Sequence, residues 1–419
     1  MTLYKLNLQL FAGEVQTTDR SELSPTMKTY YKTDLIELAE AKLVHDQFGT
    51  KKPIPPNEGK TIEFRMFDSL PKAMTPLTEG VTPDGNNLSM SSMTATVAQY
   101  GDYVRVSDVL DMTAVDPIIV QATKKLGSQA GRTLDTVTRD VITAGTNVIY
   151  APKVGSGGAT TEVTSRKDLD GTCKLTPDLI FRAVAELKAM DAEPFEDGYF
   201  VAIVHPYASY DLMRNEEWID AHKYADPESI YKGEIGRLGQ CRFVETTEAK
   251  VIAPVPILHG GITKLTVKTA NSSANATVAV NEAITTKQVS YLSDNTKVYL
   301  NGTEYTVVSA TEGAAGAASI TLDTAVTCAV GDALYGVGGT SGGLSVFATM
   351  VLAQDAYGTT ELENGGLEHF VKPRGYGDDP LNQRAACGWK ATKVAKRLVE
   401  QYMVRVEHTT SFSGGAESN

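Results

Sequence analysis

The sequence of 419 residues has few of the features that mark membrane, secreted or metal-binding proteins. Its longest uninterrupted apolar runs, residues 200–204 and 251–258, are far shorter than the ~18 residues that a membrane-spanning helix needs. The four cysteines contain no Cys-x-x-Cys pair, so neither a disulfide framework nor a zinc site is predicted. Residues 1–13 are mildly apolar but too polar and too short for a signal peptide.

Positive charge is also scarce. Lys and Arg total 39 against 51 Asp and Glu, which gives a formal net charge of −12, and no block of like charge is long enough to form a tail. Proteins that grip DNA concentrate Lys and Arg on one face, because these side chains displace counterions from the phosphates. The composition therefore argues against tight DNA binding, although it does not exclude a place next to DNA.

Motifs for metal or phosphate chemistry are missing from the sequence. The six histidines form no His-Glu-x-x-His pair, and there is no Gly-x-x-x-x-Gly-Lys-Ser/Thr loop. One catalytic pattern does match, with Ser341 between glycines and followed by Asp355 and His369, the chain order of an α/β-hydrolase. A nucleophile elbow needs a sharp strand-to-helix turn, whereas this glycine-rich stretch leads into an apolar strand. A linker is the better interpretation.

Two further groups of residues have an ordinary structural explanation. The pair Asp378 and Asp379 precedes Pro380, and two adjacent carboxylates cannot enclose a cation, so a turn is predicted there. His205 follows a buried strand, where a histidine packed at a helix start is more common than a catalytic imidazole. We therefore expect no enzyme activity and no catalytic, cofactor-binding or metal-binding residue.

The first part of the chain is predicted to be an arm, residues 1–52, and a flap within residues 53–110. Apolar residues at helical spacing predict an amphipathic helix over residues 26–48. Residues 60–68 and 93–106 are strand-like, and the long proline-rich connection between them predicts a two-stranded flap. Such a ribbon is marginal alone in water, so both elements need another surface to lie on, and a neighbouring subunit is one candidate. The interface candidates are Leu35, Leu38 and Leu43 in the arm, and Ile62, Phe64, Met66, Val97 and Tyr103 in the flap.

A long amphipathic helix follows the flap. Asp116 supplies a cap, Pro117 suits the first helical position, and apolar residues recur every three or four positions until Gly145. Such a helix would form the spine of the molecule. The predicted core residues are Leu126, Leu134 and Val137 on this helix and Trp389 on a late strand.

The rest of the chain outside residues 254–343 alternates predicted helices and strands, which indicates an α+β fold. A helix is predicted over residues 176–190 and a buried strand over residues 199–204. The tail, residues 409–419, is polar and is predicted to be disordered. The predicted division is 111–175 with the spine helix, 176–253 together with 344–375, and 376–419 with return strands and the polar tail; the family resemblance set out below implies that these are a peripheral domain, an axial domain and a return to the peripheral domain.

Residues 254–343 have a different composition from the rest of the chain. Only 10 of the 83 residues from 261 to 343 are charged, against 21% of the whole sequence, and Thr, Ala, Val and Gly dominate. Short strand-like runs recur, among them residues 286–293, and Asn301-Gly302 is a strong hairpin turn. Linker-like sequences flank the block. These features predict an inserted all-β domain, a sandwich or a small barrel, on two flexible linkers.

Short motifs occur in a fixed order along the host sequence. They are Leu8 to Glu14, Val204-His205-Pro206-Tyr207, Tyr210-Asp211-Leu212, Gly236-Arg237-Leu238-Gly239 before Val244-Glu245, Ala356-Tyr357-Gly358, Lys372-Pro373, Asp379-Pro380-Leu381 and Gly388-Trp389-Lys390. With the order of arm, flap, spine helix and α+β domain, the chain resembles the major capsid proteins of tailed double-stranded DNA phages, the Hong Kong 97-type fold. The resemblance does not cover the block at 254–343.

The resemblance implies a structural protein with a Hong Kong 97-type α+β fold and an extra all-β insert. Copies of the chain would assemble in the host cytoplasm into pentamers and hexamers of an icosahedral virion head. Packaged double-stranded DNA would be a neighbour by proximity, and scaffolding, portal and decoration proteins are implied as further partners, with no membrane and no cofactor. Two alternatives stay open: a soluble α/β serine hydrolase using Ser341, and a surface- or carbohydrate-binding protein that works through the insert.

Overall fold

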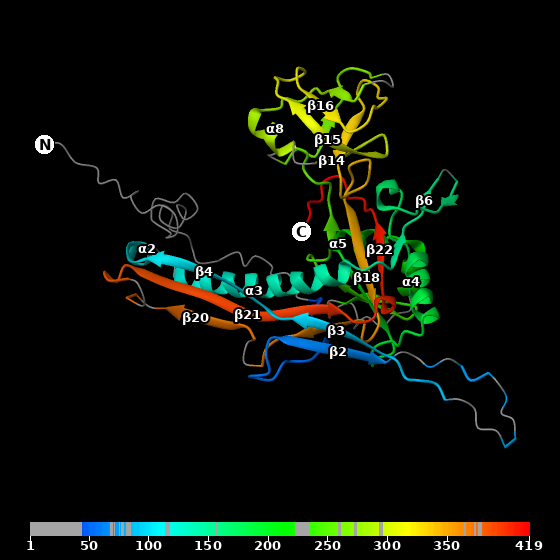
Figure 1. Ribbon diagram of the computed structural model, residues 1–419, viewed down its shortest axis with the longest axis vertical. Coiled ribbons are helices and arrows are strands. Elements are labelled where there is room, and N and C mark those ends of the chain that lie inside the picture. Colours follow the sequence, from blue (N-terminus) through cyan, green and yellow to red (C-terminus); the bar gives the residue numbers. More distant parts are fainter. Residues whose placement is uncertain are drawn as a thin grey trace. The chain divides into compact units, whose positions relative to one another are not determined.

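The structure is a computed structural model (Figure 1). It describes residues 44–419 except 68–69, 71, 75, 77–78, 81–84, 114–117, 156, 223–233, 259–260, 272–274, 293–295, 364–365, 373 and 376–378. The chain divides into two compact units. The first contains the residues up to Val141 together with Tyr357–Leu398, and the second contains Ile142–Ala356 and Val399–Asn419. No helix among the described residues is both long enough and apolar enough to cross a membrane.

The first unit is built on a five-stranded sheet around one long strand, β21 (Arg384–Arg397). This strand pairs antiparallel with β4 (Ala98–Ser107) over ten residues, from Arg384 opposite Ser107 to Lys393 opposite Ala98. β21 also pairs with β19 (Tyr357–Thr360) and β20 (Glu368–Lys372), and β1 (Thr50–Lys51) extends the sheet beyond β19. The sheet therefore joins segments from the beginning and the end of the sequence.

The spine helix, α3 (Ile118–Thr143), lies along this sheet, as Figure 1 shows. Its residues Leu126 and Ala130 are buried in a cluster with Cys387 and Trp389 of β21. Leu134 is partly buried and packs against the same cluster, whereas Val137 is partly buried only. A short helix, α2 (Asp108–Thr113), precedes α3, and its buried Leu110 packs with Val106 and Ile118.

The flap is a two-stranded antiparallel ribbon of β2 (Thr61–Phe67) and β3 (Met90–Thr96). Its register runs from Thr61 opposite Thr96 to Phe67 opposite Met90. The single strand predicted over residues 93–106 is wrong, because the chain passes from β3 to β4 at Val97 and the two strands join different sheets.

The second unit is built on a seven-stranded sheet. Its order is β5 (Val148–Tyr150), β22 (Met403–His408), β18 (Val346–Leu352), β8 (Phe200–Val204), β10 (Cys241–Glu245) and β9 (Glu234–Leu238), with β11 (Val251–Ile252) paired to β18. The two central strands, β8 and β18, are buried at every position, which explains their continuous apolar sequences. Helix α4 (Pro177–Ala189) buries Leu179, Ile180 and Leu187 in the core that includes β8.

Shorter elements complete the second unit. They are α5 (Pro206–Met213), α6 (Glu216–His222), the hairpin of β6 (Lys153–Val154) and β7 (Thr160–Thr161), and the 3-10 turns η2 (Arg166–Asp168) and η3 (Glu400–Tyr402).

Strand pairing corrects the predicted domain division. β19 and β20 pair with β21, so residues 357–372 belong to the first unit rather than to the axial part at 344–375. β22 pairs with β18 over six residues, so the last strand belongs to the second unit rather than with the return strand β21. Residues 142–175 also lie in the second unit, not in a peripheral domain with α3.

The predicted disorder of the tail is also wrong. Thr409, Thr410 and Ser413 are buried, and Thr409 Oγ1 donates hydrogen bonds to the carbonyls of Asp170 and Cys173. The Asn419 side-chain amide donates to the carbonyls of Thr247 and Ala249. A polar segment is disordered when its polar groups have no hydrogen-bond partners in the fold. The polar groups of this tail have several such partners, so the tail is ordered.

The inserted block forms a closed six-stranded barrel. The strands follow the order β12 (Lys264–Thr266), β17 (Ala333–Gly336), β14 (Lys297–Leu300), β15 (Thr303–Thr311), β16 (Ser319–Leu322) and β13 (Thr277–Ala279). A bridge between Val267 and Val280 joins the two ends of this order. The interior holds a separate core that includes Val267, Val298, Val307, Ile320 and Leu334. Closure leaves no long unpaired edge in the barrel.

One predicted strand of the insert is a helix. The sequence predicts an extended segment over residues 286–293, but Thr286–Leu292 form α8. Thr285 and Gln288 make a capping box, in which the Gln288 side-chain carbonyl accepts the Thr285 backbone N–H at 2.9 Å. Val289 and Leu292, three residues apart, then face the barrel core. The capping signal outweighs the β-branched composition of this segment.

Candidate assembly surfaces and arm anchor

The flap carries apolar side chains that nothing in the described part of the subunit covers. Phe67 is 61% exposed and Met90, directly opposite it, is 50% exposed. Three more large apolar residues of the same hairpin are at least half exposed, namely Leu70, Met74 and Leu88. Isolated exposed apolar residues are ordinary, whereas a group of this kind at the end of one hairpin indicates a contact surface.

The predicted interface residues separate into two groups. Met66 and Tyr103 are exposed and Ile62 is partly exposed, as an interface role requires. Phe64 and Val97 are buried within the subunit, so their assignment to an intersubunit surface is wrong. Phe64 packs closely on β19, where a Cβ placed on Gly358 would lie 3.0 Å from the Phe64 ring. Leu35, Leu38 and Leu43 lie outside the described residues.

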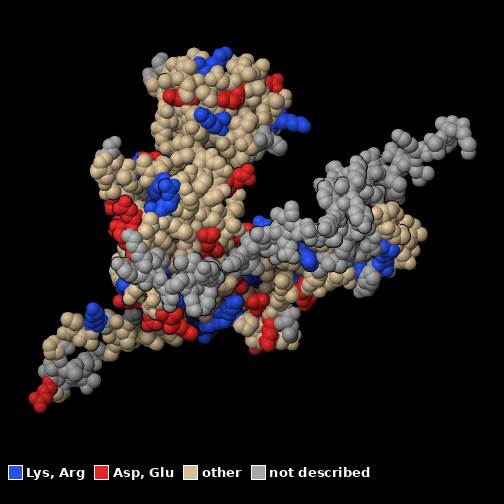
Figure 2. Space-filling view, turned by 180° about the vertical axis from the view of Figure 1, so that it is seen from behind, with Lys and Arg blue, Asp and Glu red and all other residues tan. Residues whose placement is uncertain are grey.

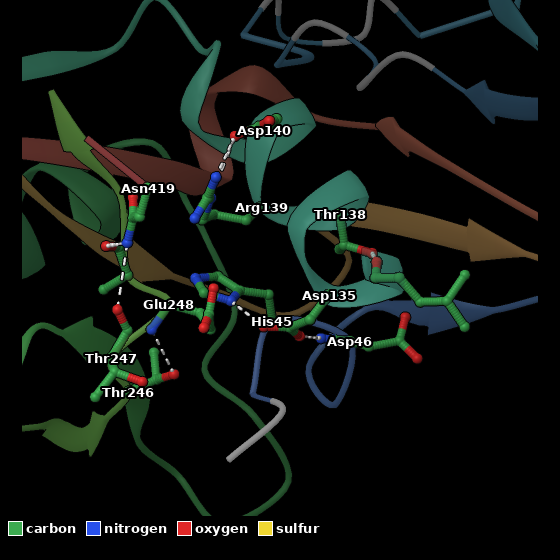
Figure 3. A network of polar contacts seen from close by, with 12 residues as sticks. His45, Asp46, Asp135, Thr138, Arg139, Asp140, Thr246, Thr247, Glu248 and Asn419 are labelled. Carbon is green, nitrogen blue, oxygen red and sulfur yellow. Dashed lines mark hydrogen bonds and ion pairs between the residues drawn. The ribbon is translucent and has the colours of Figure 1, made fainter. Parts of the chain in front are cut away.

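A buried polar cluster in the first unit fixes the point where the arm ends, and we call it the arm anchor (Figure 3). It consists of His45, Asp46, Asp135, Tyr357 and Lys393, and Figure 3 labels the first three of these. His45 Nδ1 lies 2.7 Å from Asp135 Oδ2, and both side chains are 1% exposed. The other carboxylate oxygen of Asp135 accepts the backbone N–H of Asp46 at 3.3 Å. These two contacts hold the chain on helix α3.

The arm anchor also contacts the sheet. Lys393 of β21 is 2.6 Å from Asp46, and the Tyr357 hydroxyl of β19 donates to the carbonyl of His45. Burial raises the pKa of the Tyr357 phenol, so this hydroxyl stays protonated and remains a donor. Residues 45–48 form a turn and a bend, so the last part of the helix predicted over residues 26–48 is not helical, and the rest lies outside the described residues.

Gly49 lies in close contact with the Tyr357 ring, which lets the chain pass from the arm anchor directly to the edge of β19. A Cβ at Gly49 would lie 2.6 Å from the Tyr357 ring, so any larger residue would push the chain off β19. Directly afterwards, Thr50 and Lys51 pair in parallel with Gly358 and Thr359. The glycine is thus required by packing and not by a turn.

In the second unit, exposed aromatic residues gather on α5 and the tail. The rings of Tyr207 and Phe412 stack with centroids 4.6 Å apart, and Tyr210 meets Phe412 edge-on at 5.4 Å. Arg214 donates to the Tyr210 hydroxyl at 2.9 Å. All three rings are more than 40% exposed, so this group is a second candidate contact surface.

Two histidines near this surface, the buried His408 and the partly buried His205, are structural. His408 Nδ1 is 3.1 Å from the carbonyl of Thr409 and therefore donates to it, which leaves Nε2 to accept the Thr349 hydroxyl at 2.9 Å. Burial lowers the pKa of His408 to about 4 and that of His205 to about 4. His205 accepts the backbone N–H of Tyr207 at the start of α5, a helix cap rather than a catalytic arrangement.

The other residues weighed for chemistry also have structural roles. The backbone N–H of Ser341 donates to the carbonyl of Lys167, and His369 lies on β20, opposite Trp389, in the first unit. Asp379 accepts three backbone N–H groups, from Gly375, Gln383 and Arg384, and the bond from Arg384 is the largest cause of its lowered pKa. Within the described residues, no three His, Cys, Asp or Glu side chains are grouped as a metal site would require.

Charge on the visible surface is mixed. Figure 2 shows one face on which Lys and Arg are interspersed with Asp and Glu, and no continuous basic surface appears there among the described residues. This agrees with the net charge of −12 and gives no footprint for gripping nucleic acid.

Sequence reasoning missed the arm anchor. Its acidic member, Asp135, belongs to a buried stripe of α3 that also contains Thr138 and Arg139. This stripe is polar, so a search for apolar periodicity passes over it. The one signal in the sequence is the spacing of Asp135, Thr138 and Arg139. Residues three and four positions apart lie on the same face of a helix, so these three polar side chains could be buried together.

Comparisons with known proteins agree with this architecture. Residues 91–246 match the sequence model of a family described as phage capsid protein. The capsid structure of the cyanophage P-SCSP1u is similar to 93% of this chain and 94% of that one, at 14% identity and a TM-score of 0.52. The capsid of Ralstonia phage GP4 is similar over 92% and 96%, at 11% identity and the same TM-score. No curated protein matches the sequence. At these identities the structural likeness shows a shared fold.

The arm anchor gives a direct test of stability. Replacing Asp135 with Ala leaves His45 buried without its partner, so we expect Asp135→Ala to lower the free energy of unfolding by about 2–5 kcal/mol. The matched control is Lys51→Ala, which removes a 3.7 Å ion pair with Asp46 whose lysine is 58% exposed and should cost less than about 1 kcal/mol. Urea unfolding of both variants measures the difference. Equal effects would show that the arm anchor does not hold the chain.

Proposed function

We propose that this chain is a phage capsid protein, the major structural subunit of the virion head, and that its copies form rings of five and six. These rings would close an icosahedral shell around double-stranded DNA. The family match and the shared fold support a capsid subunit in a shell of many copies, and the ring sizes are our proposal.

The flap is the observation that carries this proposal. A two-stranded ribbon has too little buried surface to be stable alone, and this one exposes Phe67, Met90 and Leu88. Burial of apolar surface contributes about 25 cal/mol per Å², so a second copy covering this hairpin would stabilise both the ribbon and the assembly. A monomeric protein would gain nothing from keeping these residues exposed.

We also propose that the chain has no catalytic role. The hydrolase alternative depends on Ser341, and the hydrogen bond from its backbone holds a linker instead of exposing a nucleophile. Packaged DNA would be a neighbour rather than a specific ligand, because the net charge is negative and the visible face shows no continuous basic surface among the described residues. Scaffolding, portal and decoration proteins are further proposed partners.

The two units have distinct proposed roles. The first unit, with spine helix and flap, would be the peripheral domain, and the sheet of the second unit would be the axial domain that surrounds the ring axes. The barrel would project from the axial domain on the outer surface of the shell. Its separate core and closed sheet support this, because both let it fold without help from the host sheet.

The flap proposal predicts a loss of assembly without a loss of folding. Because Phe67 and Met90 are exposed in the subunit, Phe67→Ser combined with Met90→Ser should leave thermal unfolding unchanged while stable shells fail to form. Negative-stain microscopy with sedimentation measures the outcome. Thr94→Ser, an exposed change in the same hairpin, is the control and should assemble normally. Shells of ordinary stability from the double variant would contradict the proposal.

The barrel proposal predicts a smoother shell. The N–H of Val255 donates to the carbonyl of Val337 at 2.7 Å, so these residues are close enough to be joined by a short Gly/Ser turn that replaces residues 256–336. We expect this variant to fold and to form shells with the same floor diameter and no protrusions in electron micrographs. A variant that fails to fold would show that the barrel belongs to the core of the host domain.

A further inference from the structure

The barrel has its own core, which raises the question of what fixes its orientation. It is joined to the sheet of the second unit by two chain segments, residues 253–256 and 337–343. The sequence predicts flexible linkers there, because proline, glycine and serine dominate. A closed barrel on two flexible linkers would pivot freely.

The two linkers are in fact paired with each other and with the host. The N–H of Val255 donates to the carbonyl of Val337 at 2.7 Å. Within the second linker, the N–H of Thr340 donates to the carbonyl of Leu344 at 2.9 Å, and the Leu344 N–H returns to the Thr340 hydroxyl at 2.9 Å. Thr340 is fully buried. Linkers with these bonds are ordered structure.

Gly336 at the end of β17 and Gly339 in the second linker serve close packing. A Cβ at Gly336 would lie 1.7 Å from the carbonyl oxygen of Val255, and one at Gly339 would lie 2.4 Å from that of Leu344. Neither position has space for any side chain. Gly342 differs, because the nearest atom to its Cβ position is the Thr340 hydroxyl at 3.8 Å. The expectation of flexible linkers is therefore wrong, since composition alone does not distinguish flexibility from close approach.

A third segment of the second unit reaches the barrel. The carbonyl of Lys167, in η2, accepts the N–H of Ser341 at 2.8 Å. The Lys167 ammonium lies 3.5 Å from the carbonyl of Gly302, in the turn between β14 and β15. This residue therefore contacts both a linker and the base of the barrel.

The segment that carries Lys167 is itself anchored in the sheet. Arg166 donates two hydrogen bonds, of 2.7 and 2.6 Å, to the carboxylate of Glu407. Glu407 lies on β22 with its side chain fully buried, and Arg405 Nε is 2.8 Å from the same carboxylate. A bidentate guanidinium on a buried carboxylate has one favoured geometry, so the position of Lys167 is fixed.

We propose that residues 165–168 act as a brace that locks the barrel to the axial sheet as one rigid body. The barrel is then held at the first linker, at the second linker and at the Gly302 turn, and attachment at three separate places removes the pivot. This inference concerns the single subunit and does not depend on the proposed shell. A failure of the brace would leave the proposed function untouched.

Hydrogen–deuterium exchange of the purified full-length protein tests the brace. Amides of peptides covering residues 253–258 and 337–344 should be protected in the wild-type chain, because their N–H groups are bonded. Gly336→Ala should speed exchange in both peptides by about tenfold, the loss expected for about one hydrogen bond. Peptides from the barrel core, residues 298–307, and from β8 should exchange as in the wild type.

Two controls keep the result interpretable. Gly342→Ala makes the same chemical change six positions later, in the second linker, without a clash and should leave exchange unchanged. Ser341→Pro removes the N–H that donates to the carbonyl of Lys167, whereas Ser341→Ala keeps it. Only the proline variant should therefore speed exchange. This pair of variants tests the brace even if Gly336→Ala does not fold. Wild-type linkers that exchange as fast as an unstructured peptide would overturn the brace, as would equal exchange in the Ser341 variants.

Discussion

The pairing of late strands with early ones is the constraint on which the rest of the molecule depends. β21 completes the first unit only by pairing over ten residues with β4, nearly three hundred positions earlier in the sequence. β22 completes the second unit by pairing with β18 and with β5. Contacts of this range cost loop-closure entropy before any packing compensates, so both units need extensive cores. Helix α3 and the buried strand β8 provide the centres of those cores.

The same topology explains how the chain accommodates a whole extra domain. β11 and β18 are antiparallel neighbours, so the ends of the block between them lie close together. A barrel inserted between β11 and β18 does not disturb the pairing of these strands, provided that its two linkers run side by side where they leave the sheet. The glycines at the linkers make this possible by letting two backbones touch, and the brace from η2 then fixes the result.

Much of the architecture could be predicted from local patterns. Apolar periodicity predicted α3 and α4, and continuous apolar runs predicted β8 and β18, because burial on one or both faces imposes those patterns directly. The flap was predicted from two strand-like segments with a proline-rich connection. These features are local, because each depends on the pattern within one continuous stretch of the chain.

The remainder depended on contacts between distant residues. Phe64 and Val97 look like the other apolar flap residues in sequence, and only their packing in the subunit separates them from Phe67. The tail looks disordered until Asn419 is seen bonded to residues 247 and 249. The arm anchor joins His45, Asp135 and Lys393, whose polarity hides them from any search for a core. Composition describes a segment, but the partner that orders it lies elsewhere in the chain.

We propose that this chain functions by assembling into a shell of many copies. Cryo-electron microscopy of particles formed by the purified full-length protein tests this most directly. We expect closed shells built from rings of five and six copies, in which each flap lies on a neighbouring subunit. Folded, soluble protein that remains in small discrete oligomers under every assembly condition would contradict it.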